Sequence, residues 1–64
     1  MRFHIDNMEC GGCVRGVEKA ITSVDSDARV HADLPTRNVA IESSLPAEAF
    51  SRALQQAGFF ASEV

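Results

Sequence analysis

The 64-residue chain lacks several features, and each absence excludes a class of protein. No apolar run approaches the ~20 residues that a membrane-spanning helix needs, so direct insertion into a membrane is not expected. There is no arginine-rich stripe and no aromatic platform, and the formal net charge is −3, so nucleic acid is not expected as a partner. Only two cysteines are present, and they are too close in sequence to cross-link distant elements.

The N-terminus also lacks a basic segment followed by an apolar core, which is the pattern of a secretory signal. Met1 leads directly into the alternating pattern of a strand. We therefore expect a cytoplasmic protein. The cytoplasm is a reducing compartment and would keep both cysteines as thiols. The length is near the lower limit for independent folding and leaves no room for a linker or repeat. Residues 1–64 are accordingly predicted to form a single domain. The N-terminal methionine and the complete fold favour a stand-alone protein, and the alternative is a detached sensor or regulatory domain of a larger transporter.

Both cysteines lie in the stretch Asn7–Val14, which has the sequence NMECGGCV. The residues before this stretch alternate like a strand and those after it repeat like a helix, so the cysteines are predicted at the start of a helix. There the first amide N–H groups have no intrahelical partner and the macrodipole supplies partial positive charge, which together stabilise a thiolate. Two such sulfurs can bind a soft metal ion or act as a redox couple.

Apolar spacing along the chain predicts six elements in the order βαββαβ. Period-two alternation marks the strands, and apolar residues three and four apart mark the helices. Pro46 is expected in the first turn of the second helix and Gly58 at its C-cap. This order suits an α+β, ferredoxin-like sandwich, in which a four-stranded antiparallel sheet carries two helices on one face. The predicted strands are Met1–Asp6, Ala28–Leu34, Val39–Ser43 and Phe59–Val64, and the predicted helices are Gly12–Ser23 and Pro46–Ala57.

The chain as a whole resembles the heavy-metal-associated domain, a family that includes small bacterial copper chaperones and their gold- and silver-binding relatives. The family pattern Gly-Met-x-Cys-x-x-Cys appears here as NMECGGC over Asn7–Cys13, and AGF at Ala57–Phe59 resembles the family's Ala-Gly-Tyr. The resemblance implies that Cys10 and Cys13 are the two ligands of a monovalent soft ion, Cu(I), Ag(I) or Au(I). Apart from the resemblance, thiolates are soft ligands that favour such ions, and the sequence offers no set of four ligands for a structural zinc.

The resemblance further implies a metal carrier and not an enzyme. A partner's thiolates would attack the bound ion and displace Cys10 and Cys13 in turn. The implied partner is a similar metal-binding domain of a P-type metal ATPase or a metal-responsive regulator, with the carrier a monomer or a metal-bridged dimer. Arg15 and Lys19, four residues apart on the predicted helix, form either a basic docking strip for an acidic partner or a solvated helix face beside Glu18.

Four residues around the cysteines have more than one interpretation. Glu9 resembles the acid that adds an oxygen ligand in zinc, cadmium or lead domains, and otherwise it is a solvated loop residue. Met8 is interpreted as core filler beneath the loop and not as a thioether ligand. Phe59 shields the site or simply packs, without the hydroxyl of the family's tyrosine. Asn7 replaces the family's glycine and is expected to preserve the loop because asparagine tolerates left-handed backbone.

Two other functions are compatible with the motif. A divalent-metal domain for Zn, Cd, Pb or Hg would use Glu9 as an extra ligand. A thiol–disulfide oxidoreductase would also place Cys-x-x-Cys at a helix start, but the chain is short for that fold. Moreover, neither Pro35 nor Pro46 lies where a strand would present a proline to the cysteines. His4 and His31 are expected on the open sheet face, as surface residues or as a second metal site if neighbouring strands bring them together.

Overall fold

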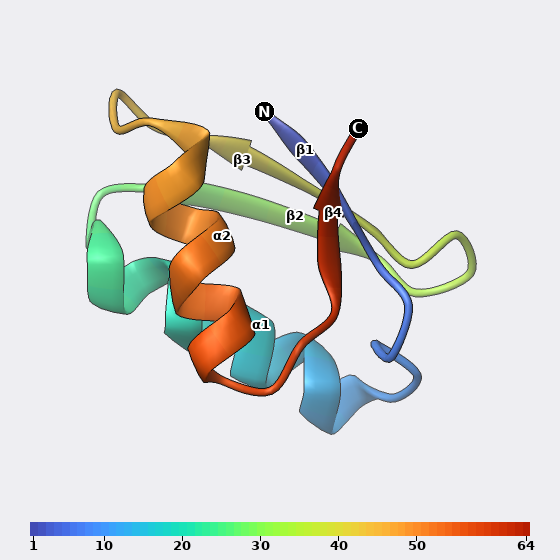
Figure 1. Cartoon of the computed structure of the whole chain (residues 1–64). Helices are drawn as coiled ribbons and strands as arrows, with labels where there is room; N and C mark the ends of the chain where they lie inside the picture. The colour runs from blue at the N-terminus through green and yellow to red at the C-terminus, as the bar shows by residue number, and fades with distance from the viewer.

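The structure, a computed structural model, describes residues 1–64 and consists of two layers (Figure 1). One layer is an antiparallel sheet with the strand order β2-β3-β1-β4, and the other consists of two helices that cover one face of the sheet. This arrangement confirms the predicted ferredoxin-like sandwich. The elements are β1 (Arg2–Ile5), α1 (Gly11–Val24), β2 (Arg29–Asp33), β3 (Asn38–Glu42), α2 (Ala47–Gln56) and β4 (Ala61–Glu63).

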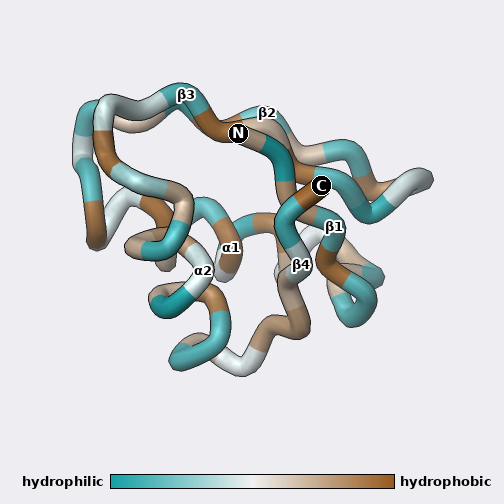
Figure 2. The backbone as a smooth tube through the Cα atoms, turned by 45° about the horizontal axis from the view of Figure 1, so that its top comes forward, coloured by the Kyte–Doolittle hydropathy of each residue, from teal (hydrophilic) through white to brown (hydrophobic).

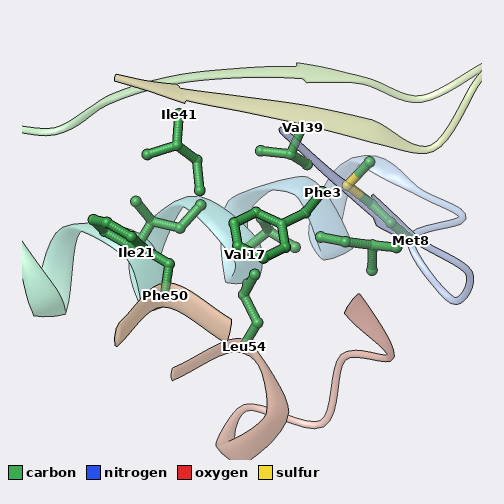
Figure 3. Close-up of a cluster of buried hydrophobic side chains, with 9 residues drawn as sticks. Phe3, Met8, Val17, Ile21, Val39, Ile41, Phe50 and Leu54 are labelled. Atoms are coloured by element: carbon green, nitrogen blue, oxygen red, sulfur yellow. The ribbon is translucent and has the colours of Figure 1, made fainter. Parts of the chain in front are cut away.

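Successive side chains of a strand point to opposite faces of a sheet, and hydrophobic and hydrophilic residues follow one another along the chain, as the hydropathy colours of Figure 2 show. The inner face of the sheet is therefore apolar. Phe3 of β1 pairs with Val39 of β3 and therefore lies on the same face. Val30 of β2 pairs with Ile41 of β3 in the same way. The buried core joins this face to the helices (Figure 3) and comprises Phe3, Ile5, Met8, Val17, Ile21, Val39, Ile41, Phe50 and Leu54.

A glycine closes the end of α2, but it lies one residue beyond the C-cap position predicted for it. Gly58 has φ 91° and follows the C-cap residue Ala57. Its N–H donates to the Gln55 carbonyl at 3.0 Å, and the Phe59 N–H donates to the Leu54 carbonyl at 2.9 Å. These two bonds form a Schellman motif, in which a left-handed residue lets the chain reverse over the last helical turn.

Several predicted boundaries differ from the structure by one or two residues. Pro46 is the N-cap of α2 and not part of its first turn, because its ψ of 150° is extended and the helix begins at Ala47. β4 begins only at Ala61, which pairs with Ile5, since the Phe59 N–H is already used in closing α2. Neither helix has both the length and the apolarity needed to cross a membrane.

Candidate metal centre

The two cysteines lie where the sequence predicts them, at the start of α1. Cys10 is the N-cap residue, with extended backbone at φ −147° and ψ 169°, and Cys13 lies in the first turn. Both are free thiols, and their Sγ atoms are 3.2 Å apart. Cys10 is exposed and Cys13 is partly buried against the core. A ligand entering from solvent would therefore meet the Cys10 sulfur first.

The helix terminus is electrostatically suited to a thiolate. No acidic residue occupies the first turn of α1, and the Cys10 side chain does not cap the helix, so no side chain of that turn offsets the positive end of the macrodipole. The pKa of Cys13 lies below the ordinary value for a thiol, chiefly because of a backbone hydrogen bond from Glu9, with smaller contributions from the Cys10 side chain and backbone. Desolvation and the negative charge of Glu9 oppose this lowering of the pKa. Cys13 thus loses its proton more readily than an isolated thiol.

Met8 lies beneath the cysteine loop as part of the core. Its side chain is fully buried and belongs to the cluster drawn in Figure 3. The Met8 N–H donates to the Ile5 carbonyl at 3.2 Å, which turns the chain tightly at the end of β1. The interpretation of Met8 as core filler is confirmed, since a buried, flexible thioether fills space below the loop.

Asn7 preserves the loop by a different route from the one predicted. Its backbone is not left-handed, because Arg37 is the only non-glycine residue with positive φ. Instead, the Asn7 Nδ2 donates to the Gly58 carbonyl at 2.9 Å, and its Oδ1 accepts from the Phe60 N–H at 2.8 Å. The amide side chain thereby fastens the metal loop to the α2–β4 connection, which a glycine at this position could not do.

Phe59 packs against α1 just beyond the cysteines. A Cβ added to Gly16 would lie 3.1 Å from the Phe59 Cζ atom, so the ring occupies the space above this glycine. Gly16 is one turn after Cys13 on α1. The contact supports packing as the role of Phe59 and explains why the helix carries a glycine at an interior position, where glycine normally weakens it.

Arg37 is a residue near the loop that the sequence analysis did not identify. It lies in the β2–β3 hairpin, and its Nη1 donates to the Asp6 carbonyl at 3.0 Å. Its Nη2 is 3.9 Å from Glu9 Oε1. The only sequence signal would have been an arginine in a hairpin turn, a place where glycine or asparagine is more usual.

The two histidines lie on the open face of the sheet, as predicted. His4 Nδ1 is 3.0 Å from Asn38 Oδ1, and its Nε2 is 3.0 Å from Asp6 Oδ1. His31 is exposed and pairs with Ala40, not with a residue that would bring it opposite His4. The chain has no cluster of three or more His, Cys, Asp or Glu side chains placed to hold a metal ion. The register therefore gives no support to a second, histidine-based site.

The fold and the cysteine loop define the class of this protein. The model of the heavy-metal-associated domain matches residues 2–60. The chain therefore belongs to the heavy-metal-associated domain family. No curated protein sequence matches the chain.

Solved structures closely resemble the whole chain. A gold binding protein superposes with a TM-score of 0.97 at 50% sequence identity, covering 100% of this chain and 98% of the other. The copper chaperone Atx1 from Synechocystis gives a TM-score of 0.93 at 29% identity, covering 97% and 98%. A structure from work on crosstalk between Cu(I) and Zn(II) homeostasis gives 0.92 at 31% identity, again covering 97% and 98%.

Proposed function

We propose that this protein is a soft-metal chaperone that binds a monovalent ion through the thiolates of Cys10 and Cys13. The observation that carries the proposal is a pair of free sulfurs 3.2 Å apart at the exposed start of α1, without a further cluster of ligands. Two soft sulfurs suit Cu(I), Ag(I) and Au(I), whereas zinc normally takes four ligands. The similarity to a gold binding protein and a copper chaperone supports the same class of ion.

The exposure of Cys10 supports transfer by ligand exchange. In this mechanism a partner's thiolate attacks the two-coordinate ion, a three-coordinate bridge forms, and Cys10 and Cys13 leave in turn. The metal is cargo, so the protein carries it without catalysing a reaction. We propose that the partner is a similar metal-binding domain of a P-type metal ATPase or a metal-responsive regulator. We further propose that residues 1–64 act in the cytoplasm as one domain, as a monomer or a metal-bridged dimer.

The decisive experiment is an anaerobic competition between Cu(I) and Zn(II) for the reduced protein, with metal stoichiometry measured. We expect Cu(I) to displace Zn(II) and to bind to the two cysteines. Preferential binding of Zn(II) would instead favour the divalent-metal alternative. Turnover of a disulfide substrate without metal would favour a thiol–disulfide oxidoreductase.

Replacing Glu9 by alanine is expected to change Cu(I) affinity by less than about threefold, the size of effect that one exposed charge exerts. A carboxylate is a hard donor and adds little to an ion that two sulfurs satisfy, but it does assist Zn(II) or Cd(II), whose binding should weaken. Competition with chromophoric chelators measures all three affinities. Glu42→Ala, an exposed acid at the end of β3, is the control. A Cu(I) loss above tenfold would make Glu9 part of the monovalent site.

Reversing the charges of Arg15 and Lys19 together is expected to slow metal transfer to the partner domain. Both side chains are exposed on α1 next to the site, and neither belongs to an ion pair, so their field is available for steering an acidic partner. The rate should fall roughly tenfold at low salt, the lower end of electrostatic steering, and recover as salt screens the charges.

Cu(I) affinity of the isolated double variant should stay at the wild-type value, because neither side chain is a ligand. Arg2→Glu with Arg29→Glu is the matched control, since it makes the same charge change on the open sheet face. Stopped-flow transfer rates at two ionic strengths provide the comparison. If the Arg15 and Lys19 variant transferred metal at the wild-type rate at low salt, the two residues would form a solvated helix face and not a docking strip.

A further inference from the structure

Arg37 occupies a backbone conformation that its residue type disfavours. Its φ is 59°, and no other non-glycine residue in the chain has a positive φ. A residue with a Cβ rarely adopts this left-handed backbone conformation, and glycine or asparagine is preferred at such turns. Residues held in disfavoured conformations persist where the surrounding structure demands them, often beside functional sites. The contacts that Arg37 makes must therefore hold it in this conformation.

The backbone of Arg37 is fastened to both the hairpin and β1. Its N–H donates to the Leu34 carbonyl at 3.1 Å, and its carbonyl accepts from the Ile5 N–H at 2.8 Å. The second bond is an anchor between elements that are far apart in sequence. It positions the arginine side chain directly beside the segment that leads from β1 into the cysteine loop.

The guanidinium of Arg37 reaches two points of that segment. Nη1 donates to the Asp6 carbonyl at 3.0 Å, and Nη2 lies 3.9 Å from Glu9 Oε1. The planar fork of arginine can hold a hydrogen bond on one nitrogen while the other faces a carboxylate. Arg37 thus fixes the start of the loop and places a positive charge next to the acid that precedes Cys10.

Glu9 directly precedes Cys10, so its carboxylate is the acidic group next in sequence to the two sulfurs. Its oxygens are hard donors of the kind that Zn(II) and Cd(II) accept beside thiolates, while Cu(I) is satisfied by two sulfurs. A contact that holds the Glu9 carboxylate away from the sulfurs therefore lowers the affinity of the site for divalent ions but not for Cu(I).

We propose that Arg37 is a specificity-determining residue, which engages the Glu9 carboxylate and so limits how far this acid assists a divalent ion held by Cys10 and Cys13. The inference builds on the proposed function, since it explains how that site favours a monovalent ion. It is a positioning role: Arg37 touches the loop and the acid, not the metal. The sequence places Arg37 in a distant hairpin, so this role is visible only in the folded chain.

The test is a double-mutant cycle between Arg37→Gln and Glu9→Ala, with Zn(II) and Cu(I) affinities measured anaerobically by chelator competition. Arg37→Gln should raise Zn(II) affinity about threefold to fivefold, the scale of an exposed ion pair, and leave Cu(I) within about twofold. The Zn(II) gain should vanish when Glu9 is already alanine.

Two further variants keep the test decisive. Arg37→Gly suits the positive φ and removes the whole side chain, so it should reproduce the Zn(II) gain even if Arg37→Gln perturbs the turn. Arg52→Gln removes an equal charge from the Glu48 pair on α2 and should change neither affinity. An unchanged Zn(II) affinity, or an equal gain without Glu9, would overturn the role of Arg37. Failure of the wild-type protein to bind Cu(I) would overturn the proposed function instead, whatever the outcome of the cycle.

Discussion

Replacing either Cys10 or Cys13 by serine is expected to abolish tight Cu(I) binding. Each variant leaves one thiolate and one hydroxyl, and a hydroxyl is a hard donor that Cu(I) disfavours. Cu(I) affinity should fall more than about 100-fold. Removing a residue that only hydrogen-bonds to a metal ligand already lowers metal affinity about 10- to 100-fold, and here a ligand itself is removed. Anaerobic competition with a Cu(I) chelator measures the change.

The same substitutions should leave the metal-free fold nearly intact. Cys10 is exposed and Cys13 only partly buried, and neither belongs to the nine fully buried core residues. Circular dichroism and thermal unfolding of the metal-free variants are the control, and both should follow the wild type. Wild-type Cu(I) affinity in either variant would refute the assignment of these cysteines as ligands.

Replacing Phe50 by alanine is expected to have the largest effect on stability. Its ring is fully buried between α2 and the sheet in the single core of the chain (Figure 3). Phe→Ala in a core costs about 3–5 kcal/mol from lost burial and the cavity left behind. At ~0.05–0.15 kcal/mol per residue, a 64-residue chain has about 3–10 kcal/mol of stability in all. The substitution should therefore remove a large part of the free energy of unfolding.

Phe60 offers a matched control for Phe50. It is the same residue type, but 69% of its surface is exposed, so Phe60→Ala should change the free energy of unfolding by no more than about 0.5 kcal/mol. Chemical denaturation of both metal-free variants gives the comparison. A Phe50→Ala variant as stable as Phe60→Ala would mean that the core does not depend on the α2 face as the structure indicates.

The contacts that hold the cysteine loop illustrate where sequence reasoning reaches its limit. The burial of Met8 was predictable from the resemblance to the family pattern, whereas the period-two alternation of Met1, Phe3 and Ile5 would continue to Asn7 and not to Met8. The role of Asn7 was not: its backbone conformation was predicted to matter, whereas its amide bonds to Gly58 and Phe60 are what hold the loop. An asparagine side chain can bond locally or at long range, and the residue type alone does not tell which.

Local sequence patterns specify the order of the elements, the apolar face of the sheet and the position of the two thiols. These features depend on neighbours within a few residues: alternation defines a strand face, and a spacing of three at a helix start brings Cys10 and Cys13 together. The surroundings of the thiols are different, because they depend on long-range contacts. Arg37 and Gly58 meet the loop across 31 and 51 residues of chain, and such contacts follow from how elements pack, which no local periodicity encodes.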